Sequence, residues 1–531
     1  EKIRSFIPEG YYGMTAKGQN IMLTWQDQKS KSYRSFDKEK MTGLMKKLDG
    51  QKAVVEEIKK TPKKTYAPLL YDLTELQREA NQRFGYSAKE TLNIMQRLYE
   101  NHKVLTYPRT DSRYLSKDIV PTIKDRLEAC GTGPYRKLAM TAKKKDLSGK
   151  LAFVNDAKVS DHHAIIPTEQ FVDLSHMTNE ERKIYDLVVR RFLAVLYPPF
   201  EYEQTQVTVK VGGETFLASG KIVKAQGWRA AYEEEVYSDE DEEEEEAYES
   251  GKSLKGQTLP ELEKGQEIKG LVLSLTEGKT KPPAHFNEAT LLSAMENPTA
   301  YMESHDKAMA KTLGETGGLG TVATRADIIE KLFKSFLLEK RGKDIYLTSK
   351  AKQLLELVPE ELKQPELTAD WEMRLSQIAK GKLSRKDFMK DIDKYTDQVV
   401  SEIKAGAGTF RHDNLTNSKC PRCGKRMLAV KGKNSEMLVC QDRECGYRET
   451  VSRTTNARCP VCHKKMQLKG KGDGQIFVCV CGHKEKLTSF QERRKKEGAG
   501  VSKKDVQKYL RQQKDEPVNN PFADALAKIK L

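Results

Sequence analysis

Apolar residues at helical spacing predict several helices in the first two thirds of the chain. The first of them has apolar residues three or four positions apart, which form one buried face: Leu73, Leu76, Ala80 and Phe84. Gly85 interrupts this pattern, and Ser87 with Glu90 then has the spacing of a capping box that opens a second helix. The inner face of the second helix is expected to hold Leu92, Met95, Leu98 and Tyr99. Another amphipathic helix is predicted over 180–196, before Pro198 and Pro199.

The pattern changes to alternation in other segments, which predicts strands. Residues 205–211 and 215–223 alternate around the turn residues Gly212 and Gly213, and strands are also expected at 21–25 and 268–278. After Pro282 the helical pattern returns. Asn287 is placed to cap one helix, and Thr324 with Asp327 has the capping-box spacing of another. Helices are expected to continue to about 404, before a linker at 405–410.

These elements predict a mixed α/β chain of several domains. The expected parts are a β-rich part (1–65), a helical domain (66–199), a second β-rich part (200–281), a second helical domain (282–405), two zinc ribbons (406–490) and a basic tail (491–531).

The net charge is +16 over 531 residues, although the segment from Glu233 to Glu249 is densely acidic. A basic chain of this kind is suited to a polyanionic partner, and a solvated basic surface is the alternative. No stretch approaches the ~20 apolar residues needed to span a bilayer. The first residues have no secretory signal pattern, so a cytoplasmic location is expected. The missing initial methionine indicates a fragment or a processed product.

Cysteines gather near the end of the chain, where eight of the nine lie between 420 and 481. They form two sets with the spacing of zinc ribbons: Cys420, Cys423, Cys440 and Cys445, then Cys459, Cys462, Cys479 and Cys481. His483 is a rival fourth ligand in the second set. The basic residues among the ribbons and the aromatic Phe477 are suited to single-stranded nucleic acid. Cys130 is expected to be a buried thiol.

Reactive chemistry is concentrated in the segment that begins at Tyr107. Pro108 biases the tyrosine away from helical conformation, and Arg109 and Arg113 follow closely enough to bind a phosphate. A phenol held against a phosphodiester can act as a nucleophile. Taken alone, the segment favours a packing tyrosine before a turn over a nucleophile.

The segment KVLTYPRTDSRYLS (103–116) resembles the active-site segment of type IA DNA topoisomerases. Further segments are similar to that family in the same order: SDHHAIIPT (160–168), PPAHFNEATLLSAME (282–296), GGLGTVATRADIIEKLF (317–333) and ELTADWEMRLSQIAKGK (366–382). The proline after the tyrosine and the TR of the glycine-led segment resemble the topoisomerase III branch. The likeness covers 1 to about 405 and implies a toroidal core of a β-rich hinge and helical domains.

The resemblance implies a role for each matching residue. Tyr107 would attack one strand and hold a 5′-phosphoryl link, with Arg109 stabilising the phosphate and His162 assisting near it. Contacts with DNA are implied for Asp111, Arg113 and His163, and for Thr324 and Arg325 at a helix start. The partner would be single-stranded DNA in the nucleoid, without ATP or a membrane. A monomer that works with a helicase or single-strand-binding protein is expected.

Type IA enzymes also carry an N-terminal Toprim domain with an acidic Mg²⁺ site, and no segment here matches it. The acidic triplet Asp239, Glu240 and Asp241 follows no apolar strand, so a solvated loop is expected there. We therefore expect this chain alone to bind DNA without completing catalysis, and Mg²⁺ to belong to the Toprim domain.

Two other readings stay open at this stage. A non-catalytic protein that binds single-stranded nucleic acid could use the ribbons and basic tail on a topoisomerase scaffold. A rolling-circle nickase also uses a tyrosine with histidines, but its site needs His-x-His on one strand face. The adjacent His162 and His163 have the wrong alternation for that.

Overall fold

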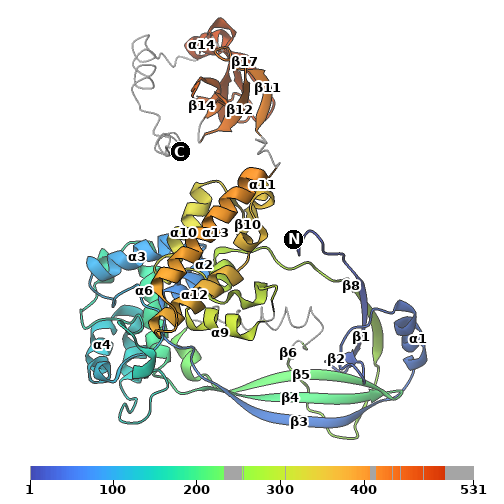
Figure 1. Cartoon of the computed structure of the whole chain (residues 1–531). Helices are drawn as coiled ribbons and strands as arrows, with labels where there is room; N and C mark the ends of the chain where they lie inside the picture. Colours follow the sequence, from blue (N-terminus) through green and yellow to red (C-terminus); the bar gives the residue numbers. More distant parts are fainter. Residues whose placement is uncertain are drawn as a thin grey trace. The chain divides into compact units, whose positions relative to one another are not determined.

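A computed structural model describes residues 2–232, 254, 256–304, 306–406, 414–432, 435–442, 444–470 and 472–496 (Figure 1). The chain forms two compact units, Glu1–Ala407 and Gly408–Leu531. The acidic run with Asp239, Glu240 and Asp241, and the tail beyond 496, lie outside the described residues. None of the helices in the described part is long and apolar enough to cross a membrane.

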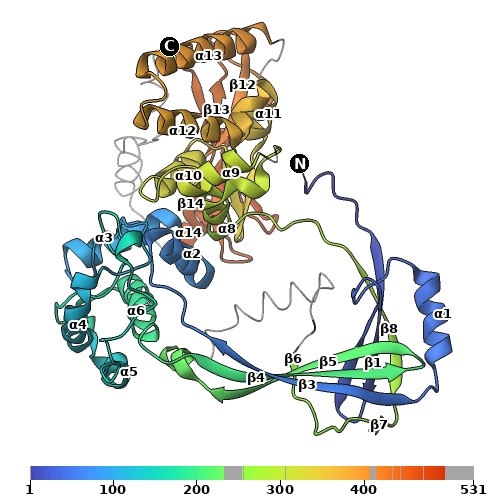
Figure 2. The same ribbon diagram turned by 60° about the horizontal axis from the view of Figure 1, so that its bottom comes forward.

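The first unit contains one large sheet with the strand order β7-β3-β4-β5-β2-β1-β8, and β6 is paired with β5. Its strands are β1 (Gly10–Gly18), β2 (Ile21–Gln26), β3 (Ala53–Thr65), β4 (Phe200–Val211), β5 (Glu214–Ala225), β6 (Gly256–Gln257), β7 (Glu267–Ile268) and β8 (Val272–Lys279). Helix α1 (Lys38–Leu48) contributes Met41 and Leu48 to the same core as Trp25 and Phe216. Strands β3, β4 and β5 run side by side over their length (Figure 2).

The predicted strands are found, with one division. Gly212 and Gly213 have positive φ angles of 55° and 90° in the tight turn between β4 and β5, where glycine is favoured. The expected strand over 268–278 is instead split into β7 and β8 around Gly270, which also has a positive φ.

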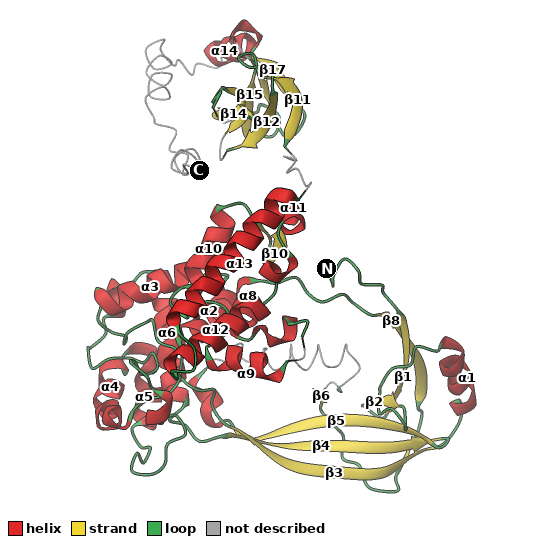
Figure 3. Cartoon of the chain, viewed as in Figure 1, coloured by secondary structure: helices red, strands yellow, loops and turns green. Residues whose placement is uncertain are grey.

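Helices make up most of the rest of the first unit (Figure 3). They are α2 (Leu73–Phe84), α3 (Ala88–Glu100), α4 (Ile123–Cys130), α5 (Arg136–Ala142), α6 (Asn179–Ala194), α8 (Glu288–Glu296), α9 (Lys307–Glu315), α10 (Arg325–Lys334), α11 (Ser349–Leu357), α12 (Glu366–Ala379) and α13 (Arg385–Ala405). A short hairpin that the helical pattern did not predict, β9 (Leu338–Arg341) with β10 (Asp344–Leu347), separates α10 from α11.

Most predicted helix starts are confirmed. Gly85 ends α2 with a φ of 70°, and the capping box of Ser87 and Glu90 opens α3. Asn287 caps α8 as expected. The capping box predicted for Thr324 is wrong, because its hydroxyl bonds the backbone of Thr321 and no side-chain cap bond reaches α10. The predicted partner of that box, Asp327, instead pairs with Lys89 at 2.6 Å.

Helices from distant parts of the sequence share a small core. Leu73, Ala88 and Leu92 from α2 and α3 pack against Leu292 of α8 and against Ala326 and Ile329 of α10. The buried Glu288 carboxylate accepts a hydrogen bond from the Ala88 amide at 2.8 Å. This packing places the glycine-rich segment before α10 beside helix α2.

The second unit is a single antiparallel sheet in sequence order, followed by a helix. The elements are β11 (Leu415–Lys419), β12 (Arg426–Lys431), β13 (Ser435–Cys440), β14 (Arg448–Arg458), β15 (Lys465–Lys469), β16 (Ile476–Val478), β17 (Lys484–Lys486) and α14 (Leu487–Lys496). Both sets of cysteines lie at the ends of these strands.

Candidate active site and metal centres

The Tyr107 segment is held against the histidine segment by Thr106. Its amide donates to the Ile166 carbonyl at 3.0 Å, and its hydroxyl accepts from the Ile166 amide at 3.0 Å. The same hydroxyl donates to the Ala164 carbonyl at 3.2 Å. These bonds fix the residue before Tyr107 against the residues that follow the two histidines.

Aromatic rings from three segments meet at Tyr107. The centroid of the His162 ring lies 4.2 Å from that of Tyr107, with the ring planes tilted by 35°. Tyr99 packs edge-on against the same ring at 5.6 Å. Tyr107 is partly exposed and His162 is exposed. The tyrosine therefore lies at the surface beside an imidazole, and it is not sealed in a core.

Sequence reasoning placed Tyr99 on the buried face of its helix, and this was wrong. Its side chain is 37% exposed, while Leu92, Met95 and Leu98 are buried as predicted. Helical spacing alone assigns Tyr99 to the apolar stripe, and only the fold shows that this edge of α3 faces Tyr107.

Thr110 fixes the backbone of His162. Its hydroxyl donates to the His162 carbonyl at 3.0 Å and accepts from the Ser112 amide at 3.1 Å. The Thr110 carbonyl in turn accepts from the Leu73 amide at 3.1 Å, at the start of α2. Because Thr110 is only 2% exposed, these bonds are shielded from water.

Arg109 and Asp111 point outward on either side of Thr110. Both are exposed, and no hydrogen bond or ion pair engages the Arg109 guanidinium among the described residues. Asp111 lies 3.5 Å from the Ser160 hydroxyl, at the edge of the histidine segment. The Arg109 guanidinium, two residues after Tyr107 in the chain, therefore has its donors available for an anion.

Arg113 and His163 are more enclosed. Arg113 donates to the Leu70 carbonyl at 3.1 Å and lies 3.8 Å from the Glu75 carboxylate. His163 has its Nδ1 2.8 Å from the Ala164 carbonyl, so this nitrogen carries the proton. Burial lowers the pKa of His163, which favours the neutral imidazole. The exposed His162 is therefore the better placed of the two histidines.

Arg325 lies in the interior, with 1% of its surface exposed. Its guanidinium donates to the carbonyls of Leu319 at 3.2 Å, Gly320 at 3.3 Å and Gly317, and to the Thr74 hydroxyl at 3.2 Å. This placement does not favour the predicted contact between Arg325 and DNA. The side chain instead ties the glycine-rich loop to α2, while Thr324 is exposed at the loop surface.

A partly buried polar network surrounds the start of α2, next to the Thr110 bond. Arg78 donates to the Glu296 carboxylate at 3.1 Å and pairs with Glu75. Burial raises the pKa of the Asp72 carboxyl to about 6, and Glu296 adds to the rise. Burial also raises the pKa of Glu75, but Arg78 and Arg113 outweigh it, and the net pKa is lowered.

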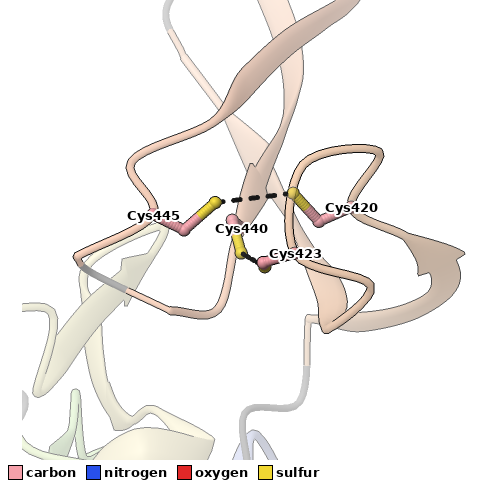
Figure 4. Close-up of side chains that lie close together, drawn as sticks. All are labelled: Cys420, Cys423, Cys440 and Cys445. Carbon is pink, nitrogen blue, oxygen red and sulfur yellow. Dashed lines mark hydrogen bonds between the residues drawn. The ribbon is translucent and has the colours of Figure 1, made fainter.

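The first set of cysteines converges on one point (Figure 4). The sulfurs of Cys420 and Cys445 are 3.7 Å apart, and those of Cys423 and Cys440 are 3.3 Å apart. A tetrahedral zinc ion with bonds of about 2.3 Å needs sulfurs about 3.8 Å apart, whereas a disulfide needs about 2.05 Å. The four sulfurs therefore fit zinc.

The second set has the same geometry. The sulfurs of Cys459 and Cys481 are 3.6 Å apart, and those of Cys462 and Cys479 are 3.3 Å apart. All four lie within 4.8 Å of one another, and His483 is not among them. His483 Nε2 lies 3.8 Å from the Glu485 carboxylate, so the structure favours four cysteine ligands.

The predicted stacking role of Phe477 is wrong. Its side chain is 5% exposed and packs on Phe490 of α14 with ring centroids 4.5 Å apart. The half-buried Lys469 and the exposed Lys486 flank Ile476 in one row across three strands of the second ribbon. An aromatic residue in a short strand can face a core as easily as a ligand, and the sequence alone does not separate the two cases.

Within the described ranges, the two cysteine sets are the only groups of three or more potential metal ligands that converge. No acidic cluster among those residues offers the converging oxygen ligands of an Mg²⁺ site.

Comparisons with known proteins agree with this geometry. The structure matches full-length topoisomerase I from Thermotoga maritima with a TM-score of 0.53 and 21% identity, over 92% of this chain and 68% of that one. The chain thus has the mixed α/β fold of a type IA topoisomerase, as predicted. The DNA topoisomerase family profile matches residues 1–390.

Relatives narrow the assignment. The chain is 58% identical over 530 residues to DNA topoisomerase 3 of Bacillus subtilis (strain 168), and 59% identical over 535 residues to DNA topoisomerase 3 of Bacillus anthracis. In both cases 100% of this chain matches 72% of the relative. The chain therefore belongs to the type IA DNA topoisomerases, on the side of the DNA topoisomerase 3 proteins. The non-catalytic and nickase readings are not favoured.

Proposed function

We propose that Tyr107 is the nucleophile that cuts one DNA strand. Attack of its phenolic oxygen on a phosphodiester forms a phosphorus–oxygen bond to tyrosine and breaks the bond to the 3′ oxygen. The phenolic proton ends on that oxygen, which leaves as a 3′-hydroxyl. Because the phosphotyrosine retains the bond energy, the reverse attack rejoins the strand without ATP.

The observation that carries this proposal is the contact between Tyr107 and His162 at the surface, with the exposed and unengaged Arg109 two residues after the tyrosine. Arg109 would bind the phosphate oxygens and stabilise the charge that develops in the transition state. His162, 4.2 Å from the tyrosine ring, would lie near the same phosphate. Asp111 and Thr324, both exposed, are proposed to line the path of the strand.

Arg113 and His163 are proposed to act indirectly. The bond of Arg113 to the Leu70 carbonyl and the bond of His163 to the Ala164 carbonyl support roles in shaping the segments beside Tyr107. Direct contact with DNA is the weaker assignment for both.

The ribbons are proposed to bind zinc and to hold single-stranded DNA through basic rows such as Lys469 and Lys486. The substrate would place the protein with the cell's DNA, in the nucleoid. Work as a monomer, and recruitment of a helicase or single-strand-binding protein, remain predictions.

The test uses the full-length gene product and a single-stranded oligonucleotide labelled at one end. Denaturation should trap a covalent adduct that carries the label of a 3′-labelled strand, since the 5′-phosphoryl link retains the downstream fragment. Tyr107→Phe should abolish the adduct and leave the affinity for single-stranded DNA within about twofold of the wild type. The control Tyr114→Phe should still form the adduct. Label transfer from a 5′-labelled strand, or an adduct in Tyr107→Phe, would contradict the proposal.

A further inference from the structure

The two ribbons are copies of one structural unit. The segments TNSKCPRCGKRM (416–427) and TNARCPVCHKKM (455–466) align without a gap. Cys420, Cys423 and Cys440 correspond to Cys459, Cys462 and Cys479, 39 residues later in each case.

Equivalent hydrogen bonds confirm the correspondence. The Thr416 hydroxyl donates to the Met427 carbonyl at 2.8 Å, and the Thr455 hydroxyl donates to the Met466 carbonyl at 2.9 Å. The Cys420 amide donates to the Lys425 carbonyl at 2.7 Å, and the Cys459 amide donates to the Lys464 carbonyl at 2.9 Å. The Cys440 amide donates to the Tyr447 carbonyl and the Cys479 amide donates to the His483 carbonyl, both at 2.8 Å.

Strand β14 belongs to both copies. Its first part pairs with β13 from Arg448 to Arg453, as β17 pairs with β16 in the second ribbon. Its last part, 454–458, corresponds to β11 of the first ribbon and pairs with β15. One continuous strand is therefore the last strand of the first ribbon and the first strand of the second.

The two ribbons meet within β14 itself. Ser452 pairs with Glu436 on one side and with Lys469 on the other, and Arg453 likewise has a partner on each side. Ser452 is 2% exposed, and its hydroxyl donates to the Glu436 carboxylate at 3.0 Å. If either neighbouring strand unfolds, buried backbone groups of β14 lose their partners, which is unfavourable.

Each ribbon has too little apolar core to fold by itself. The first buries Met427 and two cysteines, and the second buries Met466, Phe477, Phe490 and two cysteines. Metal binding is therefore expected to supply most of the folding free energy of each ribbon. Order in β14 depends on both ribbons.

We propose that the two Cys₄ sites form one linked two-metal unit, in which zinc at either site strengthens binding at the other through β14. The inference rests on the proposed zinc sites and adds the coupling between them. By thermodynamic linkage, the factor is the same in both directions. In the first ribbon the last strand continues into the second ribbon, whereas in the second ribbon the last strand, β17, is followed by helix α14.

The test measures zinc affinity in the full-length gene product by competition with a chelator of known affinity. The double substitution Cys420→Ser/Cys423→Ser removes the first site, and Cys459→Ser/Cys462→Ser removes the second. In each variant, the remaining site should bind zinc about tenfold more weakly than in the wild type. An unchanged affinity in both variants would overturn the coupling but not the zinc sites, whereas failure of the wild-type protein to bind zinc at either site would overturn both.

A matched control separates coupling through the strand from general damage. A flexible glycine–serine linker inserted between Arg453 and Thr454 leaves residues 448–453 paired with β13 of the first ribbon and residues 454–458 paired with β15 of the second. It removes only the pairing of Ser452 and Arg453 with β15. In the linker background, removing one site should no longer change the affinity of the other. Persistence of the effect in this background would overturn the role of β14. Removal of the first site should also speed amide hydrogen exchange in β15 and β16 of the protein without the linker, and should not do so in the linker background.

Discussion

Replacement of Thr110 by valine tests whether the backbone of the histidine segment positions the reaction. The substitution keeps the shape of the side chain and removes only its hydroxyl. In the native protein that hydroxyl donates to the His162 carbonyl and accepts from the Ser112 amide. Thr110→Val therefore leaves two polar groups without this partner at a position that is 2% exposed.

The magnitude follows from the cost of those two groups. A buried neutral group that loses its partner costs about 1–3 kcal/mol, so the loss of two partners should lower the free energy of unfolding by about 2–6 kcal/mol. His162 is then free to shift relative to Tyr107. If about 1.4 kcal/mol of this cost appears in the transition state, adduct formation slows about tenfold.

The assay compares single-turnover adduct formation on a 3′-labelled oligonucleotide with equilibrium binding of the same strand. Thr110→Val should slow adduct formation and leave the dissociation constant within about twofold, because Arg109 and the ribbons are unchanged. The control Thr110→Ser keeps the hydroxyl and should form the adduct at nearly the wild-type rate. A Thr110→Val rate equal to that of Thr110→Ser would refute the positioning role.

Three further outcomes are expected. Burial raises the pKa of Asp72 to about 6, so the folded state binds the Asp72 proton more tightly than the unfolded state, and stability falls as pH rises from about 4 to about 6. In urea unfolding, Asp72→Asn should remove this pH dependence and add up to about 3 kcal/mol of stability at pH 7. An unchanged pH dependence in this variant would contradict the prediction. Arg325→Met should destabilise the protein by about 3–5 kcal/mol, against less than 1 kcal/mol for the exposed Arg341→Met, and equal losses would argue against the loop-tying role. Chelation should increase amide exchange across β11–β17 and leave that of α2, α3 and α6 unchanged; protection that survives zinc removal would count against metal-dependent folding.

The elements that could be predicted from the sequence are those whose signals are local. The period of apolar residues and the Ser87–Glu90 capping box place α2 and α3 correctly, and the Gly212–Gly213 turn fixes the β4–β5 hairpin. The cysteine spacing likewise predicts both ligand sets, because a CxxC turn and a returning hairpin determine the geometry of a ribbon.

Features that depend on residues far away in the sequence could not be predicted in this way. Arg325 follows a glycine-rich loop, as a phosphate-binding residue would, yet its guanidinium bonds the carbonyls of that loop and Thr74, which is 251 residues away. The predictions for Phe477 and Tyr99 were wrong for the same reason, because the surroundings of these side chains are set by α14 and by Tyr107. A residue type at a helix start or in a strand limits the chemistry available, and the tertiary fold decides whether that chemistry faces DNA or the interior.

The repeat in the ribbons is a third case, in which the sequence shows two copies but does not show that they share a strand. The aligned TNxxCPxCxKxM segments establish two copies, and two separate ribbons are the simplest interpretation. Only strand pairing shows that Thr454–Arg458 both begins the second copy and continues the last strand of the first. Because the spacing between the copies leaves no linker, the unit that folds with metal is the pair. A further copy could join such an array only where a ribbon's last strand continues, and α14 occupies that position after β17.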